Sequence, residues 1–200
     1  MEDGYIKFKA KWDQGPALPY RFIKELNKWR DLLYEMKLIG AYKDGIGYGN
    51  ISQRFGNSDH FIISGSGTGN LESLAPDHFS LVTNIDIDHN LLHCKGPIIA
   101  SSESMSHGII YRECNDIHGV IHIHNKELWL RLLDKVPTTS EKAEYGTPEM
   151  AYEIIRLFRE TDLMDKKIIV MKGHEEGIFT FGESLEDAGK IIVEYFQELK

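Results

Sequence analysis

Cysteine is scarce in this chain. Two cysteines among 200 residues are too few for a disulfide framework, so we expect a reducing compartment and a cytoplasmic location. Long hydrophobic runs are also missing. No stretch approaches the ~20 apolar residues that a membrane-spanning helix needs, and the first residues have no apolar signal core. We therefore expect no membrane partner.

Positive charge is in deficit. The chain has 23 Lys+Arg against 31 Asp+Glu, which gives a formal net charge of -8. A protein that binds nucleic acid usually presents a basic face, so we expect no nucleic-acid partner. The deficit does not exclude a small anion that a few local groups hold. Histidine, by contrast, is plentiful at nine residues, so any metal site here would use imidazole and carboxylate ligands.

The apolar patterning indicates helices at both ends of the chain and short strands between them. We expect a single domain over residues 1–200, with an N-terminal arm at 1–18. Apolar steps of three and four, with capping residues, predict helices near 19–39, 101–114, 126–133, 148–159 and 184–196. Short apolar runs predict strands near 51–55, 61–64, 79–82, 85–87, 91–94, 118–124, 168–171 and 178–181. This mixture favours an α/β fold with substantial antiparallel pairing.

The segment Ile121-His122-Ile123-His124 has the spacing of a metal-binding strand. Residues i and i+2 of a strand point to the same face, so His122 and His124 would present two imidazoles side by side. Two neutral imidazoles in this arrangement suit zinc or a similar divalent metal. The same pattern also fits two polar residues on a solvated strand face, and the spacing alone leaves both interpretations open.

Small polar residues occur at places where the backbone could approach an anion. Ser101 or Ser102 is expected to cap the helix that follows, and a first helical turn favours negative charge. Glu103 beside them could reach a metal or move a proton, or it could be an ordinary first-turn acid. The small-residue loops at 49–52 and 64–67 expose donors to a phosphate, or they are simple turns.

The remaining histidines have weaker spacing signals. His174 follows Gly173 in a turn and is either a third imidazole ligand or an exposed turn residue. His107 lies four residues after Glu103 and is either a ligand or a satisfied, partly buried side chain. A rival metal cluster could be drawn from one polar hairpin, at Asp86, Asp88, His89 and His93. We interpret this segment as a hairpin only, and His60, His78 and His118 as background.

Taken in order along the chain, these pieces resemble the class II aldolase/adducin family. The resemblance covers about residues 26–195. The matching segments are Gly49-Asn50-Ile51-Ser52, Ile63-Ser64-Gly65-Ser66-Gly67, Ser101-Ser102-Glu103 with His107 and Tyr111, His122-Ile123-His124, Tyr145-Gly146-Thr147 and Lys172-Gly173-His174 with Phe181-Gly182 after it. The chain departs from the family pattern directly after His174, where Glu175 and Glu176 stand in place of the usual glycine.

The resemblance implies a fold, an assembly and a site. The fold is a three-layer α/β/α sandwich with a central, mostly antiparallel sheet, and the assembly is a homotetramer. His122, His124 and His174 would bind Zn²⁺ or another divalent metal such as Mn²⁺ or Co²⁺. Glu103 would be the catalytic acid/base and would also bind the metal in the empty site. The residues that match the family's substrate phosphate site are Gly49, Asn50, Ser66, Gly67, Ser101 and Ser102.

The activity that the resemblance implies is that of a metal-dependent aldolase. Such an enzyme cleaves or forms a carbon–carbon bond in a small ketose phosphate through a metal-stabilised enediolate. Two alternatives stay open. One is an epimerase or dehydratase that acts on a pentulose or thioribulose phosphate with the same metal site, although family epimerases tend to have Asp in place of Glu103. The other is a non-catalytic, adducin-like scaffold.

Overall fold

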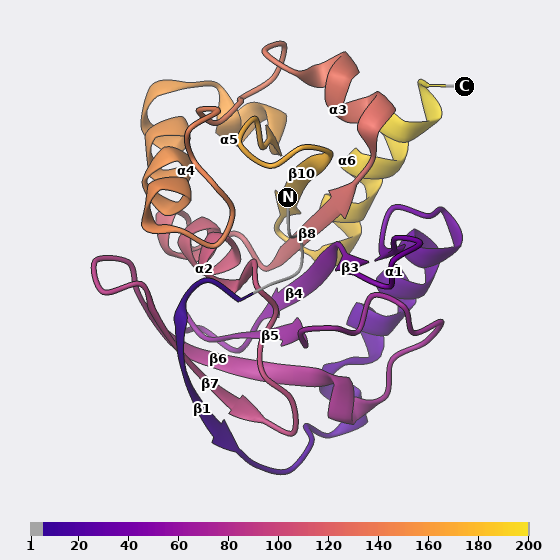
Figure 1. Ribbon diagram of the computed structural model, residues 1–200, viewed down its shortest axis with the longest axis vertical. Coiled ribbons are helices and arrows are strands. Elements are labelled where there is room, and N and C mark those ends of the chain that lie inside the picture. The colour runs from indigo at the N-terminus through magenta and orange to yellow at the C-terminus, as the bar shows by residue number, and fades with distance from the viewer. Residues whose placement is uncertain (1–5, 200) are drawn as a thin grey trace.

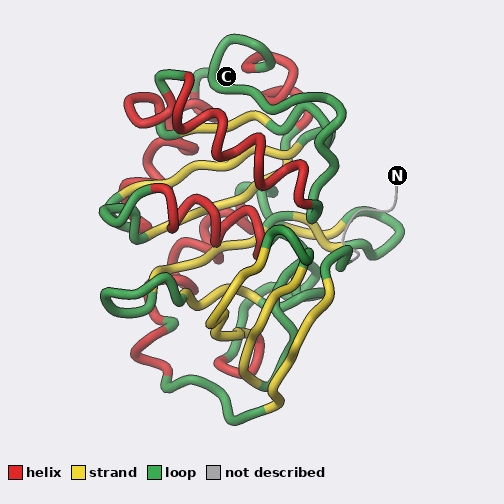
Figure 2. The backbone as a smooth tube through the Cα atoms, turned by 90° about the vertical axis from the view of Figure 1, so that its left-hand side faces the viewer, coloured by secondary structure: helices red, strands yellow, loops and turns green. Residues whose placement is uncertain are grey.

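An eight-stranded sheet runs through the centre of the protein (Figures 1 and 2). The computed structural model describes residues 6–199. The strand order is β1-β7-β6-β5-β4-β8-β10-β9, in which β1 pairs with β7 in parallel and every other neighbouring pair is antiparallel. The strands are β1 (Lys9–Gln14), β4 (Asn50–Arg54), β5 (Phe61–Ser64), β6 (Phe79–Asp86), β7 (Leu91–Gly96), β8 (Gly119–His124), β9 (Ile168–Val170) and β10 (Gly177–Gly182). A separate hairpin pairs β2 (Gly40–Ala41) with β3 (Gly47–Tyr48).

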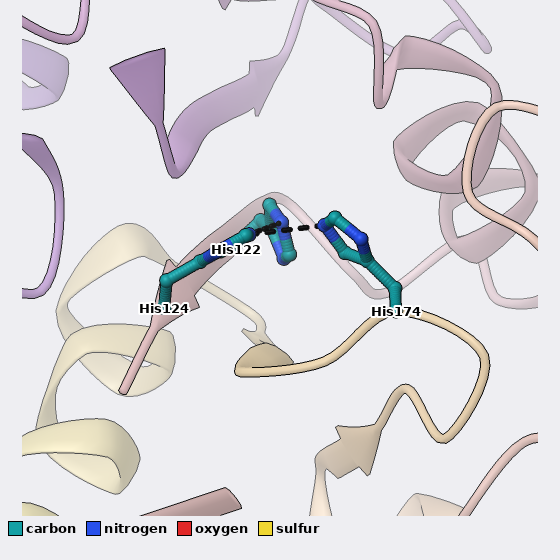
Figure 3. Close-up of side chains that lie close together, drawn as sticks. All are labelled: His122, His124 and His174. Atoms are coloured by element: carbon teal, nitrogen blue, oxygen red, sulfur yellow. Dashed lines mark hydrogen bonds between the residues drawn. The ribbon is translucent and has the colours of Figure 1, made fainter. Parts of the chain in front are cut away.

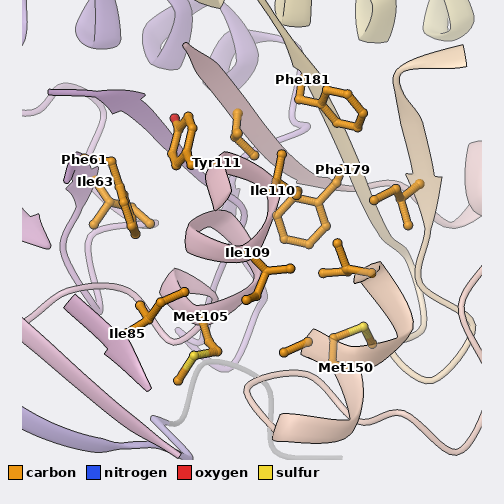
Figure 4. Close-up of a cluster of buried hydrophobic side chains, with 14 of the residues drawn as sticks. Phe61, Ile63, Ile85, Met105, Ile109, Ile110, Tyr111, Met150, Phe179 and Phe181 are labelled. Carbon is orange, nitrogen blue, oxygen red and sulfur yellow. The ribbon is translucent and has the colours of Figure 1, made fainter. Parts of the chain in front are cut away.

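Helices cover both faces of the sheet and bury a core on each side. The core on one face contains side chains of α2 (Ser104–Glu113), α4 (Pro148–Glu160) and α5 (Leu163–Lys166), which pack with Phe179 and Phe181 (Figure 4). The core on the other face contains side chains of α1 (Lys24–Glu35), α3 (Lys126–Leu132) and α6 (Leu185–Gln197). The expected three-layer α/β/α sandwich with a mostly antiparallel sheet is therefore confirmed. None of the helices in the described range has the length and apolar character that crossing a membrane requires.

Local capping chemistry explains where three of these helices begin. Asn125 Oδ1 accepts a hydrogen bond from Leu128 N at 2.9 Å, and Ser184 Oγ accepts one from Asp187 N at 3.1 Å. Thr147 caps α4 in the same way, and the next residue is a proline, whose missing N–H costs nothing at a first helical position. These caps satisfy N–H groups that the helix itself leaves without an acceptor.

Several element boundaries differ from the sequence-based expectation. The helix predicted at 19–39 is shorter: a 3₁₀ turn at Tyr20–Phe22 precedes α1. The two strands predicted at 79–82 and 85–87 are one strand, β6, with a register shift between Val82 and Asn84 in its pairing with β7. The expected N-terminal arm contains β1, which extends the sheet at its edge and whose six residues are all exposed.

Candidate functional site

The central strand β8 presents two imidazoles on one face of the sheet. Ile121 and Ile123 point into the core that contains α1 and α6, so His122 and His124 point to the opposite face. The two histidines are buried, at 1% and 5% exposure. The alternative of two polar residues on a solvated strand face is therefore wrong.

His174 completes a triad with them. It lies in the turn between β9 and β10 and is buried. Its Nε2 lies 3.0 Å from His124 Nε2, which in turn lies 3.1 Å from His122 Nε2 (Figure 3). Two imidazole nitrogens bound to a tetrahedral zinc at their usual bond length are about 3.3 Å apart. The convergence of the three rings therefore fits one divalent metal ion.

Hydrogen bonds on the far side of the rings direct the Nε2 atoms inward. His122 Nδ1 lies 3.2 Å from the carbonyl oxygen of Ile178. A carbonyl oxygen can only accept a hydrogen bond, so His122 carries its proton on Nδ1. His124 Nδ1 lies 2.8 Å from the Tyr42 hydroxyl, and that hydroxyl donates to Glu176 Oε2 at 2.8 Å. Because Tyr42 donates to the carboxylate, its oxygen accepts the Nδ1–H of His124. Both rings then carry their lone pair on Nε2, where a metal would bind.

The electrostatics of the triad keep it neutral. Burial is the main cause that lowers the pKa of His122 and His124 well below 6.5, and the neighbouring imidazoles lower it further. Burial, with the charge of Lys7 as a smaller contribution, lowers the pKa of His174 to about 3. A metal ion binds the neutral imidazole, so the triad is ready to bind metal at neutral pH without first losing protons.

Glu103 lies beside the triad. Its side chain is buried, Oε1 is 4.0 Å from His174 Nε2, and Oε2 accepts a hydrogen bond from Ser106 Oγ at 3.2 Å. Glu103 is itself the N-cap residue of α2, without a side-chain capping bond. The expectation that Ser101 or Ser102 is that cap is therefore wrong. Because the helix begins later, these two serines belong to the loop that enters it.

The six residues matched to a phosphate site lie in the same pocket as the triad and Glu103. This pocket, of about 440 Å³ including its open mouth, is lined among others by the six residues that we call the cradle: Gly49, Asn50, Ser66, Gly67, Ser101 and Ser102. Gly49 has φ +73°, and a Cβ there would lie 2.8 Å from the Ile39 side chain and 3.0 Å from the His122 carbonyl oxygen. Only glycine fits where the residue before β4 approaches β8 this closely.

The same pocket contains six residues that were not expected to be site residues. Its other lining residues are Gly47, Tyr48, Gly65, Thr68, Gly69 and Tyr145. The Tyr48 ring stacks on His124, with ring centroids 5.6 Å apart, and the Tyr145 ring is 4.6 Å from that of His174. Tyr145 lies in the segment Tyr145-Gly146-Thr147, which matches the family pattern, so the sequence contained a signal for this residue. The hydrogen bonds of Tyr42 to His124 and to Glu176 join residues far apart in the sequence, so no local pattern predicts them.

The other histidines do not contribute to the triad. Within residues 6–199, His122, His124 and His174 are the one convergent group of three or more side chains able to bind a metal. His89 instead pairs with Asp86 on the β6–β7 hairpin, so the rival cluster is a hairpin as expected. His107 is buried and hydrogen-bonded to Asn50 and Ser52, which makes it a satisfied core histidine.

Residues 41–198 match the family described as Class II Aldolase and Adducin N-terminal domain. The L-fuculose phosphate aldolase of Methanocaldococcus jannaschii is 30% identical over 191 residues, which cover 89% of this chain and 91% of that protein. A probable L-ribulose-5-phosphate 4-epimerase of Mycoplasma pneumoniae is 31% identical over 78 residues, 39% of this chain and 30% of that protein.

Among solved structures, an L-fuculose 1-phosphate aldolase superimposes with a TM-score of 0.67. The alignment covers 91% of this chain and 84% of that one, and the identity of 21% makes it a likeness of fold. The fold, the family match and the buried histidine triad agree with one another. This chain belongs to the class II aldolase/adducin family.

Proposed function

We propose that this protein is a divalent-metal-dependent aldolase that cleaves or forms a carbon–carbon bond in a small ketose phosphate. The observation that carries the proposal is a single pocket lined by the buried triad, Glu103 and the cradle. A relative that is 30% identical over most of its length is described as an L-fuculose phosphate aldolase, which supports a sugar phosphate as the substrate class.

His122, His124 and His174 would hold the metal, and Glu103 would be a further ligand before substrate binds. Zn²⁺ suits three imidazoles best, and Mn²⁺ or Co²⁺ are the alternatives. When bound, such an ion supplies Lewis-acid stabilisation of the negative charge that develops on substrate oxygen atoms. Burial keeps the three imidazoles neutral, and hydrogen bonds to Nδ1 aim the rings of His122 and His124 at the common point.

Glu103 is the residue that we assign to proton transfer. Ser106 donates to its Oε2, so Oε1, on the side of His174, is the atom that takes and returns the proton. A buried carboxylate fixed by a hydrogen bond is well placed for general acid–base work, which is worth about 10²–10⁴-fold in rate.

The cradle would bind the phosphate without a basic side chain. Within residues 6–199, no Lys or Arg lines this pocket. The donors would instead include serine hydroxyl groups of the cradle, the peptide N–H of Gly67 and the N-terminal end of α2, whose dipole favours an anion. Neutral donors in a pocket of this kind are compatible with a chain of net charge -8.

An epimerase or dehydratase that uses the same metal site is the second candidate. The similarity of part of the chain to a probable L-ribulose-5-phosphate 4-epimerase favours it. A glutamate at position 103, where the family's epimerases tend to have aspartate, favours aldolase or dehydratase chemistry. The complete triad argues against the third candidate, an adducin-like scaffold, because a non-catalytic scaffold does not need metal ligands.

Assembly and location follow the same proposal. A homotetramer is what the family resemblance implies, and light scattering after size-exclusion chromatography tests it. A cytoplasmic location agrees with the two unpaired cysteines, Cys94 and Cys114.

A substrate panel on zinc-loaded protein tests the reaction. We expect dihydroxyacetone phosphate to condense with one of several short aldehydes, and we expect less epimerisation of pentulose phosphates and less dehydration of thioribulose phosphate. Glu103→Gln should lower the aldolase rate at least about 100-fold. Glu113→Gln, at the other end of α2, is the matched control and should leave it unchanged. Full activity in Glu103→Gln, or turnover only in the epimerase or dehydratase assay, would contradict the proposal.

A further inference from the structure

A chain of buried hydrogen bonds leads from the core to the cradle. The Tyr111 hydroxyl lies 2.8 Å from Ser52 Oγ, and Ser52 Oγ lies 2.6 Å from His107 Nδ1. His107 Nε2 lies 2.6 Å from Asn50 Oδ1, and Asn50 Nδ2 donates to Ser101 Oγ at 2.9 Å. All five residues are buried, and the last two line the pocket.

The protons along this chain have one consistent direction. Asn50 presents its amide oxygen to His107, so His107 carries its proton on Nε2 and leaves a lone pair on Nδ1. Ser52 must then donate its hydroxyl proton to Nδ1, and Tyr111 must donate to Ser52. Burial lowers the pKa of His107 to about 3 and raises the pKa of Tyr111, so the imidazole stays neutral and the phenol keeps its proton.

The opposite direction would leave a buried donor unsatisfied. If every bond were reversed, Ser52 would donate to Tyr111, and the Tyr111 proton would have to find another acceptor. Among the described residues, Ser52 is the one side chain to which the Tyr111 hydroxyl is hydrogen-bonded. A buried hydroxyl without an acceptor is costly, so the direction that starts at Tyr111 is the stable one.

The direction of this hydrogen-bond chain determines the role of the Ser101 hydroxyl. Because Ser101 Oγ accepts the hydrogen bond from Asn50, its own proton is directed to another partner. We propose that Tyr111, Ser52 and His107 are positioning residues that make the Ser101 hydroxyl a donor into the pocket and so tune it for an anionic oxygen. This inference rests on the proposed function, since it assumes that the cradle binds the substrate phosphate.

A double-mutant cycle on zinc-loaded, desalted protein tests the inference, with inorganic phosphate as the probe and titration calorimetry as the measurement. We expect Ser101→Ala and His107→Leu each to raise the dissociation constant for phosphate about tenfold, as the loss of one hydrogen bond to a charged group would. The double variant should also show about tenfold weakening, because both changes remove the same donor. His107→Gln should stay within about threefold of wild type, because its amide can still donate to Asn50.

Zinc affinity serves as the control and should remain within about twofold of wild type in all variants, since none of the changed residues belongs to the triad. Should His107→Leu fail to fold, Ser52→Ala breaks the same chain and should give the same tenfold loss without adding to Ser101→Ala. A double variant weakened about 100-fold, or an unaffected His107→Leu variant, would overturn the positioning role while the cradle stands. A wild-type protein that does not bind phosphate would overturn the cradle itself, and this inference with it.

Discussion

The ring of His124 is oriented by a hydrogen bond to Tyr42, and Tyr42 is in turn hydrogen-bonded to the carboxylate of Glu176. Tyr42 accepts from His124 and donates to Glu176, at 2.8 Å for each bond. Glu176 reaches this position with φ +72°, a left-handed conformation that is uncommon for a residue other than glycine. One of the extra acidic residues after His174, Glu176, therefore has a structural role, because it accepts the hydrogen bond of the tyrosine that orients His124.

Removing this support should weaken metal binding. Tyr42→Phe leaves His124 in place but takes away the acceptor of its Nδ1–H, and such outer partners are typically worth 10–100-fold in metal affinity. We expect zinc affinity to fall about tenfold, measured by competition with a chromophoric chelator. Tyr20→Phe is the control, since Tyr20 is 56% exposed and does not line the pocket. Equal affinities for the two variants would show that Tyr42 does not orient the ligand.

His107 should make the folded state sensitive to acid. Its pKa is lowered to about 3 by burial, whereas an unfolded chain takes up the proton near 6.5. Between these two values the unfolded state binds more protons, so the free energy of unfolding falls as the pH drops below about 6.5. Between pH 7 and pH 5 this one group should cost about 2 kcal/mol.

His107→Gln provides the comparison, because glutamine keeps the hydrogen bond to Asn50 and does not titrate. Urea unfolding at pH 7 and pH 5 should show a smaller loss of stability in this variant, by about 2 kcal/mol. Parallel losses in the variant and the wild type would contradict a neutral, buried His107.

At the scale of elements, α1 organises the loop that follows β5. Arg30 is 1% exposed, and its guanidinium donates to the carbonyl oxygens of Glu72, Thr68 and Gly69 at 2.7, 3.2 and 3.3 Å. These three carbonyl groups lie just beyond the cradle residues Ser66 and Gly67. A helix on one side of the sheet thus fixes the backbone that lines the pocket.

Arg30→Met should destabilise the protein because it keeps most of the volume but removes every donor. Each buried carbonyl left without its partner costs about 1–3 kcal/mol, and Thr68 O retains a bond from Leu71 N. We expect the free energy of unfolding to fall by about 3 kcal/mol in urea titrations. Lys28→Met, on the same helix with a side chain 61% exposed, should stay within about 0.5 kcal/mol of wild type. A similar small effect for Arg30→Met would refute its role.

Elements with a strong local signal were predictable from the sequence. The alternation around His122 and the apolar stripe of the last helix correspond to β8 and α6 as expected. The strand β1 had no such signal: its residues are exposed, and its pairing partner β7 lies about 80 residues away in the sequence. Hydrogen bonds to a distant strand define it, and periodicity along the chain cannot reveal them.

In the candidate site, too, the features with a sequence pattern were predictable and those that depend on long-range contacts were not. The triad, Glu103 and the cradle were found because their residue types and order follow a family pattern, and the structure brings them to one pocket. The hydrogen bonds that support these residues were not predicted, although the matched segments include Asn50 and His107. Glu176 and Tyr42 are 134 residues apart in sequence, and Asn50 and His107 are 57 apart. The tertiary structure brings these supporting side chains next to the site residues, so a single sequence gives little sign of them.

At the scale of the molecule, the pocket that we propose for a phosphate belongs to an acidic protein. The net charge of -8 is spread over surface carboxylates, many of them in ion pairs such as those of Glu153 with Arg156 and Glu186 with Lys190. Exposed charges are screened within about 8–10 Å at physiological salt. On our proposal, the local donors of the cradle and a metal bound to the triad would determine which ligand binds, and the overall charge would have little influence there.

Metal binding to the triad, as we propose it, would be coupled to the stability of the whole fold. His124 and His174 are 50 residues apart, and they meet only when β8, β9 and β10 are assembled.

A metal that binds the folded state far better than the unfolded one raises the free energy of unfolding by about 2.7 kcal/mol at a concentration 100 times its dissociation constant. In a domain of this size we expect zinc to raise the midpoint of thermal unfolding by about 5–10 °C. A chelator should reverse the shift, and His124→Ala should abolish it. His89→Ala, which removes an exposed histidine outside the triad, should leave the shift intact. If zinc still raised the midpoint of thermal unfolding of His124→Ala, the ion would bind elsewhere, and the three buried imidazoles would not be its site.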